Sequence, residues 1–212
     1  CFDSNTNKFV IAYRDAGNSS YGTAIVGTVS GTSISFGTAV VFGAIPSSMG
    51  IDFDSNTGDV VIAWRNQSDG SKCTAVVGVV SGTDISFGTN AVFLAAYITQ
   101  PTVTFDVNAA KMVICYVYGN NGYAIVGTVS GTDISFGTAA AFETGTTNTR
   151  HQVVYDPDSL KVVITYLVSS GNLTVLLGTI SGTDISFGAK TLLGTSPRYP
   201  AVTYDTTLNK VI

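Results

Sequence analysis

The sequence predicts an all-β protein: a β-propeller built from four-stranded antiparallel blades of about fifty residues, or alternatively an open array of four-stranded β units. Three observations predict this fold class. An eight-residue motif recurs along the chain, each repeat contains four strand-like runs, and no window carries a helical period. In such a repeat protein each unit buries its apolar faces against its neighbours.

The motif Ser-Gly-Thr-Asp-Ile-Ser-Phe-Gly stands unaltered at residues 81–88, 130–137 and 181–188, and with Ser in place of Asp at residues 30–37. Successive motifs are 51, 49 and 51 residues apart, so the chain contains four repeats of one unit. We interpret the chain as a single repeat domain, 1–212. The repeats lie at approximately 1–47, 48–99, 100–149 and 150–198, with a partial repeat at 199–212.

The second repeat illustrates the expected strands, which we name A to D in chain order. Residues 49–53 form strand A. The β-branched and aromatic run 60–64 forms strand B, and its continuous apolar character is typical of a strand covered on both faces. Residues 73–80 form strand C, and residues 85–93 form strand D, with an irregularity expected at Gly88. The other repeats follow the same plan.

Two of the turns are nearly identical in every repeat. The A–B turn opens with an aromatic residue and an Asp, as at Phe2 and Asp3, and usually carries a Lys five residues after the Asp, as at Lys8. An Asp in this position accepts hydrogen bonds from backbone amides two residues on. We expect the Lys to pair with the Asp across the turn. The C–D turn is the recurring motif, and we interpret both turns as scaffold.

The B–C loops and the D–A connections vary, and in an antiparallel unit they lie at the end opposite to the uniform turns. Counted back from the aromatic-Asp pair, one position at the entry of strand A holds Ser48, Gln100, Arg150 and Tyr199 in successive repeats. Because binding residues are typically loop residues held on a rigid scaffold, we predict a ligand-binding face at this end. The alternative is that these loops have simply drifted. The candidate binding residues are Arg14, Arg65, Gln100, Tyr118, Arg150, His151 and Tyr199.

A closed ring of four blades fits the sequence poorly. Residues 1–11 and 203–212 have the same register, so they would compete for one position in such a ring. We therefore expect either more blades in a longer parent protein, of which this chain is a piece, or units that stack as an open array.

Composition excludes several classes of protein. Apolar residues make up 45% of the chain and charged residues 11%, which indicates a folded β protein rather than a disordered one. No run of about eighteen apolar residues occurs, so we expect no membrane insertion. A net charge of −4 argues against a nucleic-acid partner, because binding of phosphates rests on Lys and Arg. Cys1, Cys73 and Cys115 occupy unrelated positions of the repeat, so we expect single thiols and no disulfide framework.

Residues suited to catalysis or metal binding are sparse. His151 is the one His, which excludes a site with two His ligands, and we expect it to be a surface loop residue. Asp3, Asn5 and Asn7 have the spacing of a calcium loop, but the acid that completes such a loop is missing. We expect no metal and no cofactor. Glycoside hydrolysis needs two carboxylates about 5–10 Å apart, and Asp52 is the one acid within a strand A, so we expect no enzyme activity in this chain.

Residues 25–38, Ile-Val-Gly-Thr-Val-Ser-Gly-Thr-Ser-Ile-Ser-Phe-Gly-Thr, with the preceding run Phe-Val-Ile-Ala-Tyr at 9–13, resemble repeats of predicted tail-fibre proteins of bacteriophages. The resemblance runs through all four repeats. It implies an extracellular or virion-associated surface protein that adheres to a host glycan or another receptor. Two alternatives stay open. One is a purely structural assembly or spacer repeat, whose partners are other copies or other blades. The other is part of a carbohydrate-active enzyme whose catalytic residues lie outside this chain.

Overall fold

The computed structural model confirms the all-β fold. It describes residues 1–145, 147–168, 170–195 and 199–212, and the side chains of these residues except 147–149; within them the chain forms strands and turns and no helix. Four successive units each form one antiparallel sheet, and a short hairpin follows the fourth unit.

Each unit is a five-stranded sheet, because strand D is divided into two short strands. Unit 1 contains β1 (Phe2–Asp3), β2 (Lys8–Asp15), β3 (Tyr21–Ser30), β4 (Ser33–Phe36) and β5 (Val40–Gly43). Unit 2 contains β6 (Pro46–Asp54), β7 (Asp59–Asn66), β8 (Lys72–Ser81), β9 (Asp84–Phe87) and β10 (Ala91–Leu94). Unit 3 contains β11 (Thr99–Asp106), β12 (Lys111–Tyr118), β13 (Asn121–Ser130), β14 (Asp133–Phe136) and β15 (Ala140–Glu143). Unit 4 contains β16 (Thr147–Asp156), β17 (Lys161–Val168), β18 (Asn172–Ser181), β19 (Asp184–Phe187) and β20 (Thr191–Thr195). The hairpin contains β21 (Tyr204–Asp205) and β22 (Lys210–Val211).

Strand C pairs with three other strands in each unit. In unit 2, β8 pairs with β7 along one edge and with β9 and β10 in turn along the other edge. The chain leaves the sheet between β9 and β10, just after the amide of Gly88 has donated a hydrogen bond to the carbonyl of Val77 at 3.0 Å. The irregularity predicted at Gly88 is confirmed, and the equivalent hydrogen bond occurs in the other three units.

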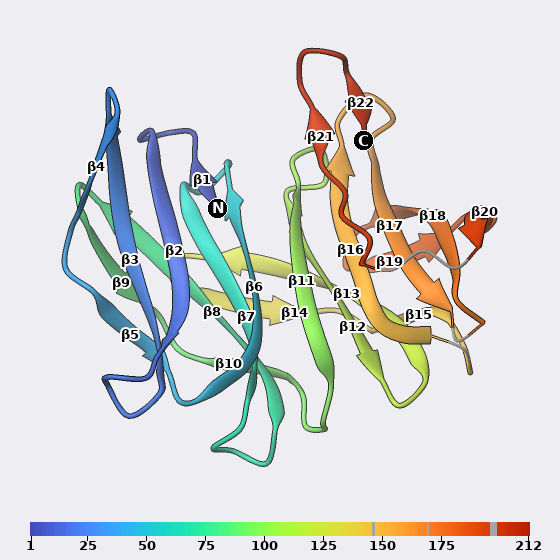
Figure 1. Cartoon of the computed structure of the whole chain (residues 1–212), viewed down its shortest axis with the longest axis horizontal. Coiled ribbons are helices and arrows are strands. Elements are labelled where there is room, and N and C mark those ends of the chain that lie inside the picture. Colours follow the sequence, from blue (N-terminus) through green and yellow to red (C-terminus); the bar gives the residue numbers. More distant parts are fainter. Residues whose placement is uncertain (146, 169, 196–198) are drawn as a thin grey trace.

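The four units pack face to face in a row, with unit 1 (blue) at one end and unit 4 (orange) at the other (Figure 1). Strands A of units 2, 3 and 4, namely β6, β11 and β16, follow one another through the middle of the molecule. Ring closure would require the outer faces of units 1 and 4 to cover each other, but Ile11 and Leu177 on these two faces are 43% and 44% exposed. The described units therefore do not form a closed propeller, and the alternative of an open array of four-stranded units describes the molecule.

The hydrophobic core consists of three apolar layers, one between each pair of neighbouring units. Strand B contributes to two layers, because alternate side chains point to opposite faces of its sheet. In unit 2, Val61 packs toward unit 3 and Ile62 packs toward unit 1, and both are fully buried. Burial of one such side chain contributes about 1.5–3 kcal/mol. The prediction that strand B is covered on both faces is confirmed for this unit.

The A–B turns form as predicted. The carboxylate of Asp3 accepts hydrogen bonds from the amides of Asn5 at 2.9 Å and Thr6 at 3.1 Å, and the equivalent Asp residues of the later turns act in the same way. The expected pairing of the Lys with this Asp is wrong at Lys8, whose Nζ donates to Thr28 Oγ1 on strand C at 2.8 Å. The turn amides already engage the Asp carboxylate, so the Lys side chain extends along the sheet instead.

The recurring motif also sets the spacing between units. A Cβ built on Gly37, Gly88 or Gly137, each the last residue of a motif, would lie 1.8, 1.9 or 2.0 Å from a carbonyl oxygen of the next unit. Those oxygens belong to the third residue of the following motif, which is Thr83, Thr132 and Thr183 respectively. Each motif therefore contacts the next one, and only glycine permits the approach. Gly188 has no such neighbour among the described residues, where the nearest atom is the carbonyl oxygen of Leu177 in the same unit, at 3.7 Å from the built Cβ.

Substitution of the motif glycine should have opposite outcomes in the middle and at the end of the row. Gly88→Ala forces a methyl group into the Thr132 carbonyl, so we expect the free energy of unfolding to fall by about 1–3 kcal/mol. Gly188→Ala makes only an ordinary van der Waals contact with the described residues and should leave that free energy nearly unchanged. Urea unfolding of both variants and the wild type measures the difference. Equal losses in the two variants would show that the close approach does not matter.

Candidate functional site

Strand pairing places both variable connections at one end of every unit, which we call the variable end. In unit 2, Asn66 pairs with Lys72 across the B–C loop, and strand A begins beside Asn66. At the opposite end Asp54 pairs with Asp59 across the A–B turn, and the C–D turn lies at that same end. The predicted separation of uniform turns from variable loops is thus a property of the fold.

A β-bulge marks the entry of strand A in units 2 and 3. Ser47 and Ser48 of β6 stand opposite the single residue Arg65 of β7, and Gln100 and Pro101 of β11 stand opposite one residue of β12. The register of β16 in unit 4 also shifts at its entry. A bulge redirects the side chains of its extra residues. At Gln100 the backbone lies in the left-handed region, with φ of +40°, and this residue is exposed.

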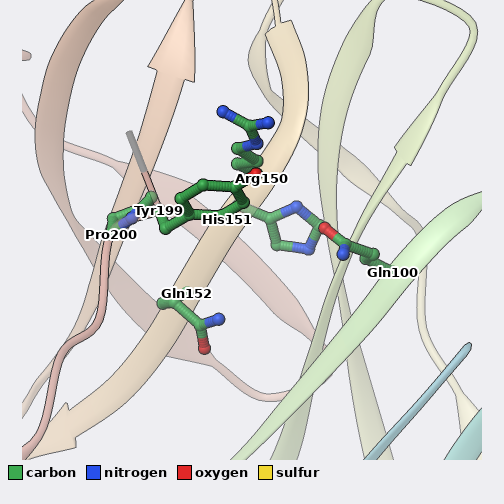
Figure 2. A pocket seen from close by; sticks show the side chains of 6 residues that line it. All are labelled: Gln100, Arg150, His151, Gln152, Tyr199 and Pro200. Atoms are coloured by element: carbon green, nitrogen blue, oxygen red, sulfur yellow. The ribbon is translucent and has the colours of Figure 1, made fainter. Parts of the chain in front are cut away.

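Three adjoining pockets follow these entries across units 2, 3 and 4, and we call the surface that they form the entry groove. The most voluminous of the three, about 360 Å³, is lined by Gln100, Arg150, His151, Gln152, Tyr199 and Pro200 (Figure 2). The other two pockets, of about 250 and 230 Å³, continue the groove past Ser48 toward Arg65. Gln100 lines all three pockets and so lies at the centre of the groove.

The entry groove contains five of the seven candidate residues and all four of the register-equivalent entry residues. The five candidates are Arg65, Gln100, Arg150, His151 and Tyr199. The other two lie at the variable end but line none of these pockets: Arg14 is exposed near the end of β2, and Tyr118 is exposed at the end of β12. Equivalent positions of successive repeats therefore meet in one groove, whereas B–C loop positions 14 and 118 stay apart from it.

Arg150 and Tyr199 form a stacked pair at one end of the groove. The guanidinium carbon of Arg150 lies 4.0 Å from the centre of the Tyr199 ring, which is the geometry of a cation–π interaction. Tyr199 is 75% exposed, and its backbone also lies in the left-handed region. The stacked guanidinium limits the orientations of an otherwise exposed ring.

Arg65 forms a similar pair with Tyr97 near the other end of the groove, with the guanidinium carbon 4.3 Å from the ring centre. Arg65 also donates from Nη1 to the carbonyl of Ile98 at 3.2 Å and from Nε to Ser47 Oγ. These contacts join strand B of unit 2 to the bulge of its own strand A and to the connection that leads into unit 3. Arg65 thus holds the groove together as well as lining it.

His151 differs from the expectation of a surface loop residue. It lies within β16, which starts earlier than predicted, and it is only 1% exposed. Its Nε2 lies 3.1 Å from the carbonyl oxygen of Cys115 in unit 3. A carbonyl can only accept, so Nε2 carries the proton of this hydrogen bond. His151 therefore forms part of the floor of the groove and links units 3 and 4.

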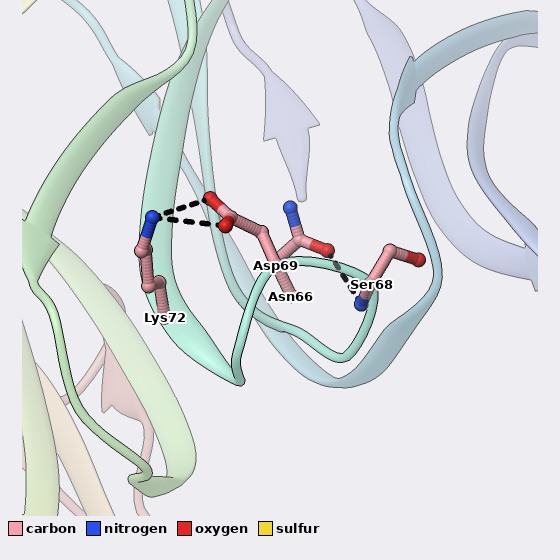
Figure 3. A network of polar contacts seen from close by, with 4 residues as sticks. All are labelled: Asn66, Ser68, Asp69 and Lys72. Atoms are coloured by element: carbon pink, nitrogen blue, oxygen red, sulfur yellow. Dashed lines mark hydrogen bonds and ion pairs between the residues drawn. The ribbon is translucent and has the colours of Figure 1, made fainter.

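The B–C loop of unit 2 is stabilised within itself. Asn66 Oδ1 accepts a hydrogen bond from the amide of Ser68 at 3.0 Å, and Lys72 Nζ contacts both carboxylate oxygens of Asp69 at 2.9 and 3.0 Å (Figure 3). An exposed ion pair of this kind contributes at most about 1 kcal/mol. None of these four residues lines the entry groove.

Sequence reasoning missed several groove residues. Gln152 follows Arg150 by two positions, and the strand period of two could have placed both side chains on one face. Tyr97, which contacts Arg65 beside the groove, precedes the entry residue Gln100 by three positions. Alignment of the repeats gives no signal for this contact. That contact depends on the path of the connection between units 2 and 3.

Among the residues that the structure describes, the groove is lined mainly by neutral polar, aromatic and cationic side chains. None of its described lining residues is an Asp or Glu, and the described part of the chain holds no cluster of three side chains suited to bind a metal ion. The three cysteines are free, as expected. Burial raises the pKa of the Cys73 thiol to about 12 and also raises that of Cys115, so neither is a thiolate at neutral pH.

Asp52 lies outside the entry groove, and its side chain makes a contact between two units. Its Oδ2 accepts a hydrogen bond from the amide of Phe105 at 2.9 Å, which ties strand A of unit 2 to strand A of unit 3. Thr104 repeats this contact one unit later, where its Oγ1 accepts from the amide of Tyr155 at 3.1 Å. Burial raises the pKa of Asp52, although the amides of Phe53 and Phe105 oppose the rise.

Comparison with models of known protein families gives no match, and comparison with curated proteins gives none either. No helix capable of spanning a membrane occurs in the described part of the chain.

The raised pKa of Asp52 predicts a specific pH dependence of stability. The Asp52 carboxyl group keeps its proton to a higher pH in the folded state than in the unfolded state. Its contribution to the free energy of unfolding therefore decreases as the pH rises from about 4 through the raised pKa. Asp52→Asn keeps an oxygen acceptor for the Phe105 amide and cannot ionise. The free energy of unfolding of Asp52→Asn, relative to wild type, should therefore increase with pH across this window. Denaturant titrations at several pH values measure it, and a constant difference would contradict the assignment.

Proposed function

We propose that the chain is a non-enzymatic adhesion module that binds a glycan in the entry groove. One observation carries the proposal. The entry positions of four successive repeats hold four different residues, and these line a single groove, while the turns at the other end of the units stay nearly identical. The fold places these entry positions side by side, and in this chain they supply the groove with an exposed aromatic ring and, together with Arg65, two arginines.

The chemistry of the groove suits a carbohydrate. The exposed ring of Tyr199 offers an apolar surface beside polar groups, as the C–H face of a sugar requires. The Gln100 and Gln152 amides can each donate and accept, which matches sugar hydroxyl groups, themselves both donors and acceptors. The pocket around Tyr199 reaches the lower part of the size range of small-ligand sites, about 300–1,000 Å³, and the groove continues beyond it over two further units.

The charges in the groove favour a glycan that carries a carboxylate. Arg65 and Arg150 line it, and no described Asp or Glu does. A guanidinium group recognises a carboxylate through paired hydrogen bonds. The preferred ligand is therefore an oligosaccharide with acidic sugars that extends along several units. A module of this kind acts outside the cell or on a virion, in agreement with what the tail-fibre resemblance implies.

Alanine substitutions within and outside the groove test this proposal. Tyr199→Ala and Gln100→Ala should each weaken binding of an acidic oligosaccharide about tenfold, which corresponds to about 1.4 kcal/mol. Tyr118→Ala is the matched control, because it removes an exposed Tyr at the same end of the molecule but outside the groove. A glycan array followed by calorimetric titration of the bound ligand gives the affinities. The proposal fails if no glycan binds, or if Tyr118→Ala weakens binding as much as Tyr199→Ala.

A further inference from the structure

The three pockets of the entry groove follow one another in a definite order. The pockets of about 360 and 230 Å³ share Gln100, His151 and Gln152 in their linings, and the pockets of about 230 and 250 Å³ share Ser48 and Gln100. The pockets of about 360 and 250 Å³ have only Gln100 in common. The pocket of about 230 Å³ therefore lies between the other two, and we call it the middle pocket.

Each outer pocket is lined by one arginine that stacks on a tyrosine. In the pocket of about 360 Å³, which we call the Arg150 pocket, the guanidinium carbon of Arg150 lies 4.0 Å from the centre of the Tyr199 ring (Figure 2). In the pocket of about 250 Å³, the Arg65 pocket, the guanidinium carbon of Arg65 lies 4.3 Å from the centre of the Tyr97 ring. Stacking engages the flat face of a guanidinium group, whereas its N–H bonds lie in the plane of the group. The rings therefore hold both arginines in place and leave their donors for other partners.

Both arginines keep donors for a carboxylate. A guanidinium group has five N–H donors. At Arg65, Nε donates to Ser47 Oγ and Nη1 donates once to the carbonyl of Ile98, so the second N–H of Nη1 and both N–H groups of Nη2 remain. No described residue accepts a hydrogen bond from the guanidinium of Arg150. Because two N–H groups on one edge of a guanidinium bind the two oxygens of a carboxylate, each outer pocket has the donors for one carboxylate.

The middle pocket has a different lining. Among the residues that the structure describes, no Lys, Arg, Asp or Glu lines it. Met49 and Pro101 give it apolar surface, and the amides of Gln100 and Gln152 can donate and accept hydrogen bonds. This lining suits the C–H face and hydroxyl groups of an uncharged sugar. A carboxylate placed here would lose water without gaining a cationic partner, which is unfavourable.

The backbone of the groove supports a site built for a ligand. Gln100 and Tyr199 occupy equivalent entry positions, and both have left-handed backbones, with φ of +40° and +59°. Residues other than glycine and asparagine adopt this conformation rarely, because the side chain crowds the backbone. Such conformations gather at ligand sites, where the surrounding structure maintains them. Here they occur at the residue shared by all three pockets and at the ring that stacks on Arg150.

We propose that the entry groove has two carboxylate subsites, at Arg65 and Arg150, separated by a neutral subsite at Gln100. The ligand class that fits is a glycan with two acidic sugars and at least one uncharged sugar between them. The groove then recognises the spacing of the acids along the glycan as well as their presence. This inference rests on the proposed function and adds to it the number and the order of the charges that are bound.

Glucuronic acid alone tests for two separate subsites. In two-dimensional NMR titrations of the wild type it should shift two groups of backbone amides, one around Arg65, such as Thr99, and one around Arg150, such as Gln152. The methyl ester of glucuronic acid keeps the sugar ring but lacks the charge, so at equal concentration it should shift both groups much less. Arg150→Gln should abolish the shifts around position 150 and keep those around Arg65.

Arg14→Gln is the matched control for Arg150→Gln. It removes an exposed arginine at the variable end that lines none of the three pockets, so both groups of shifts should remain. Neither Arg14 nor Arg150 donates a hydrogen bond to a described residue, so circular dichroism should show a retained fold in both variants.

A probe with two acids tests whether one ligand engages both subsites. Sheets pack about 10 Å apart, so a spacer that spans two units must reach about 20 Å. Two glucuronic acids joined by a flexible spacer of this reach make the second contact intramolecular. In calorimetric titrations this probe should bind at least tenfold more tightly than a probe with one glucuronic acid and one glucose on the same spacer. Arg150→Gln should remove the difference.

Three results would each overturn the two-subsite arrangement: a single group of shifted amides, equal affinities for the one-acid and two-acid probes, or the same loss in Arg14→Gln as in Arg150→Gln. The proposed function would survive these results if an acidic oligosaccharide still bound in the groove and lost affinity in Tyr199→Ala. If glucuronic acid shifts no amide and no glycan binds on the array, both proposals fail.

Discussion

The packing of sheet against sheet between neighbouring units is the interaction on which the whole structure depends. Strand B of each unit is apolar on both faces, so a single sheet cannot bury itself and needs a neighbour on each side. Trp64, Tyr116 and Tyr166 stand at the same place in successive sheets and are fully or almost fully buried. Covering these faces produces the row of units, and the two outermost faces remain apolar for the same reason.

The recurring motif serves this packing in two ways. Its first glycine adopts a positive φ, +63° at Gly82, so that strand C can turn into strand D within two residues. Its last glycine, as at Gly88, lets the backbone of the next unit approach closely. The motif is therefore a turn and an interface contact at once. A motif that meets its own copy in the next unit must keep its spacing, which accounts for its repetition almost without change.

The candidate site also results from the regular spacing of the units. Because each strand A enters its sheet at the same place and through a shift in register, residues about fifty positions apart come to lie side by side. Gln100 lies at the centre of the resulting groove, between Ser48 and Arg150. Farther along, toward the A–B turns, the hydrogen bond from the Phe105 amide to Asp52 holds strands A of units 2 and 3 together. A repetitive scaffold thus presents a non-repetitive surface.

The period, the strands of each unit, the two uniform turns and the end at which variable residues gather could all be predicted from the sequence, since they follow from local patterns that recur in every repeat. The sequence also identified Ser48, Gln100, Arg150 and Tyr199 as equivalent positions. The choice between a propeller and an open row required the three-dimensional structure, because closure depends on the angle between sheets and not on their local pattern. Contacts between units likewise buried His151, turned Lys8 away from Asp3 and placed Arg65 on Tyr97. These contacts join residues whose separation follows no repeat pattern, so the local sequence carries no signal for them.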